Sequence, residues 1–237
     1  GYSNLAIGAS GILGIELRKN FNIPYLAVNI SDFWDRWHIS LSTWLRDYVY
    51  ISLGGNRKGI IRKYWNLMIT FWVSGIWHGM NWTFVVWGAL HGVYNIIHSM
   101  IISKTKTKNV QKFKSLKMIG TFFMVDFAWL FFRADSIGHA VRLIKKMITE
   151  LDLFSVLNYE MAISMGMEFL DIVVLVVALL ILVLVDLTSD KMEYSKKIVS
   201  KPLLVRWSIF YIVIFIILIF GYYGPEFSAA QFIYAQF

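Results

Sequence analysis

The feature that most constrains this chain is an apolar run long enough to cross a lipid bilayer. Residues 169–187 include the stretch IVVLVVALLILVLV, which carries no charge. A helix needs about 20 mostly apolar residues to span the hydrocarbon core. A second run, residues 203–223, has Trp207, Tyr222 and Tyr223 near its ends, as is typical of segments anchored at both membrane interfaces. The sequence therefore predicts a chain that folds in a bilayer.

Two further segments are candidates for membrane insertion. Residues 118–132 number only 15 and include Asp126, so they predict a short or partly buried span. Residues 64–102 are long enough for two passes, broken near 75–81, or for a re-entrant pair. The composition agrees, because 57% of the residues are hydrophobic and 16% are charged, against about 45–50% and about 25% in soluble domains. These values disfavour a soluble enzyme and a disordered chain.

The net charge of +8 is concentrated between the apolar runs. Basic residues gather in three clusters, at 54–63, 103–117 and 191–206, whereas 133–168 is close to neutral. Cytoplasmic loops of membrane proteins carry such an excess of Lys and Arg. The pattern predicts that the three basic loops are cytoplasmic and that 133–168 and the C-terminus lie outside. It also disfavours a nucleic-acid-binding surface.

Residues 31–50, SDFWDRWHISLSTWLRDYVY, are too charged to span and too aromatic for a solvated loop. They predict an interfacial amphipathic helix, capped by Ser31 or Asp32, paired internally between Asp32 and Arg36, and ended by the glycines at 54–55. Its apolar face would consist of Phe33, Trp37, Leu41, Trp44 and Tyr48. His38 lies beside this face, and the pattern alone leaves open whether it is functional.

Three histidines fall within the apolar segments, where ionisable groups are costly and a functional role is the first hypothesis. His78 lies at a glycine-flanked break, WVSGIWHGMNW, and could be either a general base for a hydroxyl or a structural residue. His91, Asn95 and His98 recur on one helical face, which favours hydrogen bonding between helices. Their spacing is not a strong metal-binding pattern, so no metal site is predicted. The chain has no Cys, which removes thiol nucleophiles and thiolate ligands from it.

Two long motifs resemble those of a known family. They are FWDRWHISLSTWLRDYVYISLGGNRKG at 33–59 and WNLMITFWVSGIWHGMNWTFVVWGALHG at 65–92, with FAWLFFRADS at 127–136 and FIYAQF at 232–237 in support. The chain resembles the membrane-bound O-acyltransferase family, and within it the bacterial alginate O-acetyltransferase branch. The likeness implies that 1–237 is the C-terminal portion of one longer membrane domain. The implied fold class is an all-α polytopic bundle with short, tilted or re-entrant helices around a central cavity.

The resemblance also implies a site and a reaction. His78 matches the family's invariant histidine, His38 matches its second histidine, and His91 matches a position with a structural role. The expected reaction moves an acyl group, in the first instance acetyl, from a cytoplasmic thioester such as acetyl-CoA towards a hydroxyl of an extracytoplasmic polysaccharide such as alginate. No tightly bound cofactor is expected, and no donor-binding residue is assigned. The expected partners are the lipid bilayer and an extracytoplasmic acyltransferase, at the bacterial inner membrane.

Alternatives to this function belong to different classes. Within the family, the chain could serve D-alanyl transfer to teichoic acid. Outside it, a transporter could use the histidines to relay protons, and a scaffold could anchor a partner enzyme without catalysis. Acyl transfer from a labelled donor would separate these alternatives.

Overall fold

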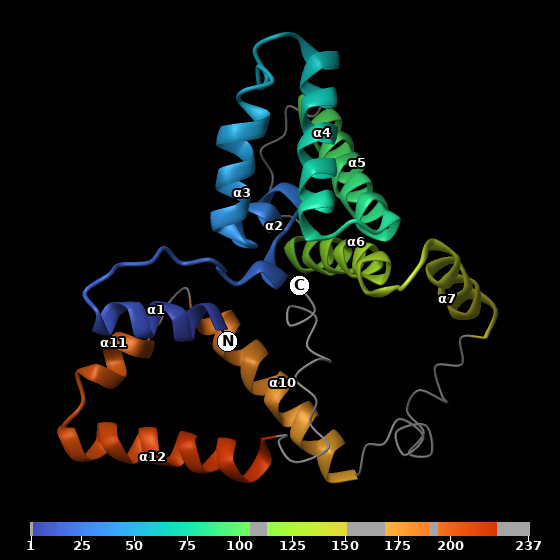
Figure 1. Ribbon diagram of the computed structural model, residues 1–237. Helices are drawn as coiled ribbons and strands as arrows, with labels where there is room; N and C mark the ends of the chain where they lie inside the picture. The colour runs from blue at the N-terminus through green and yellow to red at the C-terminus, as the bar shows by residue number, and fades with distance from the viewer. Residues whose placement is uncertain (1, 105–112, 151–168, 190–193, 222–237) are drawn as a thin grey trace. The chain divides into compact units, whose positions relative to one another are not determined.

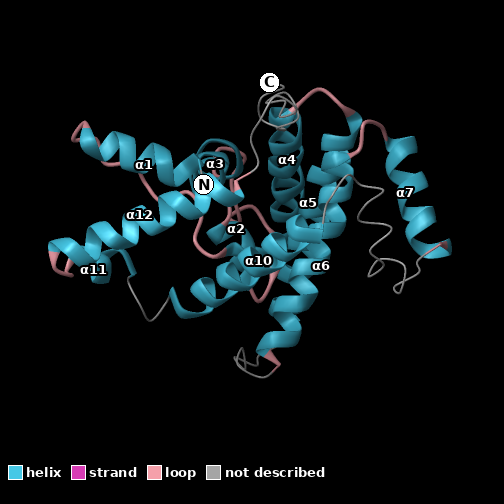
Figure 2. Cartoon of the chain, turned by 90° about the horizontal axis from the view of Figure 1, so that it is seen from below, coloured by secondary structure: helices cyan, strands magenta, loops and turns pink. Residues whose placement is uncertain are grey.

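The structure is a computed structural model that describes residues 2–104, 113–150, 169–189 and 194–221 (Figure 1). These residues form helices and connecting turns, and no strand occurs among them (Figure 2). The chain divides into two compact units, residues 1–152 and 153–237. The first unit contains α1 (Tyr2–Ile12), α2 (Ile30–Arg36), α3 (Ile39–Leu45), α4 (Ile60–His78), α5 (Trp82–Lys104), α6 (Lys114–Arg133) and α7 (Ile137–Thr149), with a 3-10 turn at Pro24–Leu26 and a π-helical segment at Arg46–Tyr50.

The centre of the first unit is the antiparallel pair formed by α4 and α5, which lie side by side (Figure 1). The segment predicted as two passes or a re-entrant pair folds as these two helices. The break between them is at 79–81, where the Asn81 side chain accepts a hydrogen bond from the backbone N–H of Thr83 at 3.1 Å. This bond caps the start of α5.

α6 packs against α5 and forms the core of the unit with it and with α2. The buried apolar residues fall into two clusters, which are Trp87, Ala128, Phe131, Ala134 and Ala140, and Ala27, Ile30, Phe33 and Val125. The span expected at 118–132 lies within α6, which is 20 residues long, includes Asp126 and is partly buried.

The continuous helix expected over 31–50 is wrong. The chain forms α2, breaks at Trp37 and His38, and resumes as α3 and the π-helical segment. The expected apolar face is divided accordingly: Phe33 and Leu41 are buried, whereas Trp44 and Tyr48 are 51% and 66% exposed.

The start of α2 also differs from the prediction. Asn29, not Ser31 or Asp32, caps the helix by accepting a hydrogen bond from the backbone N–H of Asp32 at 2.9 Å. The expected pair of Asp32 and Arg36 is confirmed at 2.6 Å. The predicted stop is confirmed as well, because Gly54 and Gly55 both have positive φ.

The second unit contains α10 (Phe169–Ser189), α11 (Tyr194–Val199) and α12 (Leu203–Phe220). Both long helices are apolar over most of their length, and the described residues bury none of their spanning windows. Side chains of this kind need lipid or another apolar surface around them. The two spans predicted at 169–187 and 203–223 thus form helices, although Tyr222 and Tyr223 lie outside the described residues, as does the motif at 232–237.

Four helices of the described chain, α5, α6, α10 and α12, are long and apolar enough to cross a membrane. Residues 105–112, 151–168 and 190–193 lie outside the description, so parts of the three loops used for the topology prediction are not placed. The fold is an all-α membrane protein, in agreement with the predicted class.

Candidate active site

His78 is the last residue of α4 and is largely buried, with 8% of its surface exposed. The helix ends there because Gly79 has φ 155° and ψ 162°, a conformation that is essentially restricted to glycine. The imidazole is enclosed by aromatic rings, with centroid distances of 5.2 Å to Trp87 and 5.1 Å to Phe132. No hydrogen bond involving this ring occurs among the described residues.

The contact between His78 and Trp87 depends on an unusually close approach of α4 and α5. A Cβ built on Gly75 would overlap the carbonyl oxygen of Phe84, and one built on Gly88 would overlap the carbonyl oxygen of Phe71. Small residues allow helix backbones in membranes to approach in this way. The glycines therefore set the distance between the helix that carries His78 and the helix that carries Trp87.

His38 occupies the break between α2 and α3 and has φ 45° and ψ 52°, in the left-handed region. A non-glycine residue held in this region costs on the order of 1–3 kcal/mol, and such residues cluster at functional sites. An upstream segment holds the strained turn in place: the Asn20 carbonyl accepts from the N–H of Ile39 at 2.8 Å, and the N–H of Asn22 donates to the carbonyl of Arg36 at 2.9 Å. The Asn20 side chain also accepts from the N–H of Ser40 at 3.1 Å.

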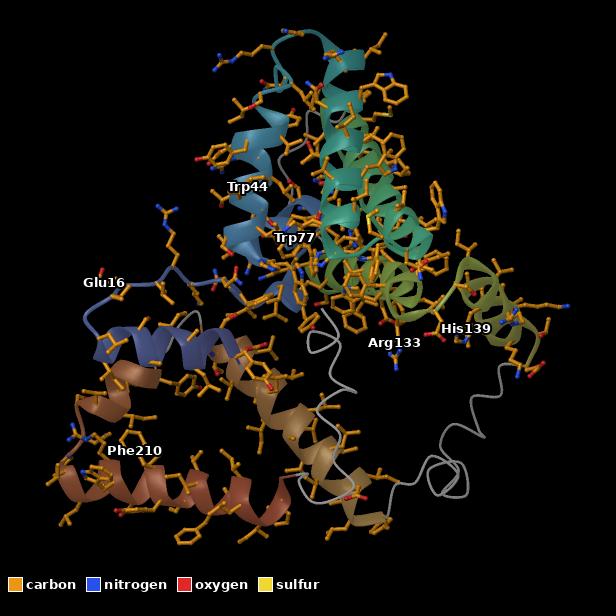
Figure 3. All side chains as sticks on the ribbon, viewed as in Figure 1. Glu16, Trp44, Trp77, Arg133, His139 and Phe210 are labelled. Atoms are coloured by element: carbon orange, nitrogen blue, oxygen red, sulfur yellow. The ribbon has the colours of Figure 1, made fainter. Side chains whose placement is uncertain are left out.

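The structure brings the two predicted site histidines together. The Trp77 ring contacts both, with centroid distances of 6.2 Å to His38 and 4.9 Å to His78. His38 is close enough to His78 for the two imidazoles to interact electrostatically. The Nδ1 atom of His38 is buried without a hydrogen-bond partner among the described residues, and burial lowers the pKa of this imidazole below its usual 6.5. Figure 3 shows Trp77 in the crowded region beside α4 where this cluster lies.

His91 is fully buried one helical turn beyond Trp87, and it accepts a hydrogen bond from another helix. The indole Nε1–H of Trp34, in α2, donates to Nδ1 of His91 at 3.3 Å, which places the proton of the neutral imidazole on Nε2. The interhelical hydrogen bond predicted for His91 is confirmed. Within α5, the side chain of Asn95 donates to the His91 carbonyl at 2.9 Å.

A cavity of about 390 Å³ lies between the 31–50 segment and the α4–α5 pair. Its lining includes Ser74, which precedes His78 by one helical turn, together with Asp35 and Arg46. Burial, and then the nearby Asp32, raises the pKa of the Asp35 carboxyl.

Two neighbouring cavities share lining residues with the first. One, of about 450 Å³, shares Arg46 and also borders Arg57 and Lys58. The other, of about 400 Å³, shares Asn95 and contains His98 and Lys63. The three cavities adjoin one another through these shared residues and are together called the cleft, and basic residues line both of the neighbouring cavities. Sequence patterns had singled out neither Asp35 nor Ser74, because each faces the cleft only through tertiary packing.

The model of the membrane-bound O-acyltransferase family matches residues 1–138, which include the whole α2–α6 region and both site histidines. The chain belongs to this family.

Curated relatives of this family member carry three different activities in their names. The chain is 46% identical over 143 residues to a probable alginate O-acetylase AlgI of Pseudomonas putida, and the match covers 60% of this chain and 29% of the relative. It is 43% identical over 148 residues to a peptidoglycan O-acetyltransferase of Helicobacter pylori, covering 62% and 28%. It is 32% identical over 126 residues to a teichoic acid D-alanyltransferase of Streptococcus thermophilus, covering 48% and 29%. The chain thus spans less than a third of the length of each relative.

Proposed function

We propose that the protein to which this chain belongs is an O-acyltransferase, and that it transfers acetyl from a thioester to a hydroxyl. The observation that carries the proposal is the pairing of a buried, unbonded His78 with a strained His38 in a member of the membrane-bound O-acyltransferase family. Buried polar atoms are normally paired, so the unpaired Nδ1 of His38 beside a largely buried His78 supports a role towards a ligand rather than packing alone.

In the proposed reaction His78 is the general base. Its neutral imidazole takes the proton of the acceptor hydroxyl while the hydroxyl oxygen attacks the thioester carbonyl, forming a tetrahedral intermediate. The C–S bond then breaks, the new ester remains on the acceptor, and the departing thiolate receives the proton from His78. His38 positions or polarises the donor or acceptor. Because this chain has no Cys, no acyl-thioester intermediate forms on it.

The cleft is our proposed route for the donor. A thioester such as acetyl-CoA carries phosphates, and Arg46, Arg57 and Lys58 border the outer cavity where they could meet them. The cleft extends inward to Ser74, one turn from His78. We infer that the donor binds transiently from the cytoplasmic side, which agrees with the basic loop at 54–63.

For the acceptor we propose an extracytoplasmic polysaccharide such as alginate, reached with the help of an extracytoplasmic acyltransferase partner, at the bacterial inner membrane. The similarity to proteins named alginate O-acetylase supports this choice over D-alanyl transfer to teichoic acid, because the latter relative is less similar and matches a smaller part of the chain.

The test is acyl transfer from labelled acetyl-CoA by the full-length purified protein with His78 changed to Gln. The amide keeps some hydrogen bonding but takes up no proton at neutral pH, so transfer should fall by about 10²-fold or more, as for the loss of a general base. His38→Ala should also lower transfer while expression is preserved. His139→Gln, on α7 and outside the site, is the matched control and should be neutral. Near-normal turnover of a well-folded His78→Gln protein would overturn the assignment, and flux without acyl turnover would favour the transporter.

A separate experiment tests the topology. Cys introduced at Ser115, at the start of α6, and at Lys145, on α7, should react with an impermeant reagent from opposite sides, because α6 is proposed to cross once. The absence of native Cys in this chain makes these positions clean probes. Labelling of both positions from the same side would contradict a single crossing.

A further inference from the structure

Helix α7 is strongly amphipathic and stands at the end of a candidate membrane span. It begins at Ile137, and Ser136 caps it by accepting a hydrogen bond from the N–H of His139 at 3.1 Å. Its apolar residues recur at helical spacing, at Ile137, Ala140, Val141, Leu143, Ile144, Met147 and Ile148. The opposite face carries Arg142, Lys145 and Lys146, and the helix contains no acid.

Among the described residues, only the centre of this apolar face is covered by protein. Ala140 is fully buried in the cluster at the end of α6, and Ile144 packs against the same cluster. Val141 and Met147 are each 55% exposed, and Ile148 is 77% exposed. A helix with a basic face and an apolar face that the described protein covers only in part has the composition of a helix that lies in a membrane interface.

The connection to α6 fixes where this face lies. The 20 residues of α6 extend about 30 Å, which matches the hydrocarbon core, so Arg133 is at its boundary if α6 crosses. Three residues separate the two helices, enough for about 10 Å of chain. Figure 3 shows Arg133 and His139 on either side of this short connection. The 13 residues of α7 extend about 20 Å, too short for a second crossing.

We propose that α7 lies flat in the membrane interface on the side where α6 ends, and that it binds anionic lipid headgroups. Its exposed strip of Val141, Met147 and Ile148 enters the acyl-chain boundary, while Arg142, Lys145 and Lys146 meet lipid phosphates. The occupant is lipid because the face continues from a membrane span, and its headgroup is anionic because the helix itself carries three cations and no acid, against the single acid Glu150 at its C-cap and Asp135, which pairs with His139, before its start. This inference requires α6 to cross but does not require any acyl transfer.

The test places single Cys residues at Val141 and Ile148, with Lys146 on the basic face as the matched control, each labelled with an environment-sensitive fluorophore. The protein is reconstituted in vesicles of phosphatidylethanolamine and phosphatidylglycerol. Lipids with a nitroxide on the acyl chain should quench the Val141 and Ile148 probes several-fold more than the Lys146 probe, and aqueous iodide should show the reverse order. Iodide quenching that is equal at all three positions would overturn the proposal, and so would shielding of Val141 and Ile148 from both quenchers, since protein would then cover the strip.

A second arm tests the headgroup chemistry. Replacing phosphatidylglycerol with phosphatidylcholine, or introducing the Lys145→Gln and Lys146→Gln changes together, should reduce the nitroxide quenching at Ile148. Quenching that is unchanged in both cases would overturn the binding of anionic lipid. The readouts report only the depth of α7, so an inactive protein with correct quenching would count against the proposed function alone.

Discussion

The close approach of α4 and α5 predicts that Gly88→Ala destabilises the protein, although alanine is the better helix former. A Cβ at position 88 would overlap the Phe71 carbonyl oxygen, and it would lie 3.4 Å from the backbone nitrogen of Gly75. Backbone atoms cannot rotate away, so α4 would have to move. Overpacking of this kind typically costs about 1–3 kcal/mol. The higher helix propensity of alanine relative to glycine stabilises the helix by only about 0.8–1 kcal/mol.

The matched control is Gly120→Ala in α6, because a Cβ there meets nothing within 4 Å. Gly120→Ala should raise the free energy of unfolding by about 0.8–1 kcal/mol, through the higher helix propensity of alanine alone. The two variants should therefore differ by about 1–3 kcal/mol in the free energy of unfolding, with Gly88→Ala the less stable. Unfolding in mixed detergent micelles, followed by tryptophan fluorescence, measures the difference. Equal stability of the two variants would refute the steric reasoning, and Gly88→Ala should also impair acyl transfer because it shifts His78 relative to Trp87.

Two further predictions concern the histidines. Trp34→Phe removes the donor to His91 and leaves a buried nitrogen unpaired, which should cost about 1–3 kcal/mol of unfolding free energy; a stability within error of the parent protein would show that the bond contributes nothing. The pKa of His38 is lower in the folded protein than its usual 6.5, so the unfolded chain takes up a proton first as the pH falls. Stability should therefore decline from about pH 6.5 downwards, and His38→Gln should show less of this decline; an identical pH profile would contradict it.

The parts of the fold that were predictable depend on local sequence. An apolar run such as 169–187 has few alternatives to a membrane helix, because every backbone polar group in lipid must be bonded within the segment. The position of His78 at a helix end was also visible, since glycines flank it and Asn81 follows. In both cases the deciding residues are neighbours in the chain.

The break at His38 was not predictable, because the contacts that create it come from elsewhere. The spacing from Phe33 to Tyr48 is helical, yet Asn20 and Asn22 hold the chain in a turn that periodicity cannot show. The bond between Trp34 and His91 likewise joins residues 57 positions apart. The recurrence of His91, Asn95 and His98 on one helical face predicted hydrogen bonding between helices, but only tertiary packing identifies the partner.

The left-handed backbone at position 38 has a consequence for how this site could change in evolution. Glycine adopts φ 45° without strain, so His38→Gly should relieve part of the backbone cost while removing the imidazole. A library of variants at this position, scored once for the amount of folded protein and once for turnover, would then rank glycine and histidine in opposite orders. Selection for abundance alone would replace the histidine, and only selection for the chemistry would keep it.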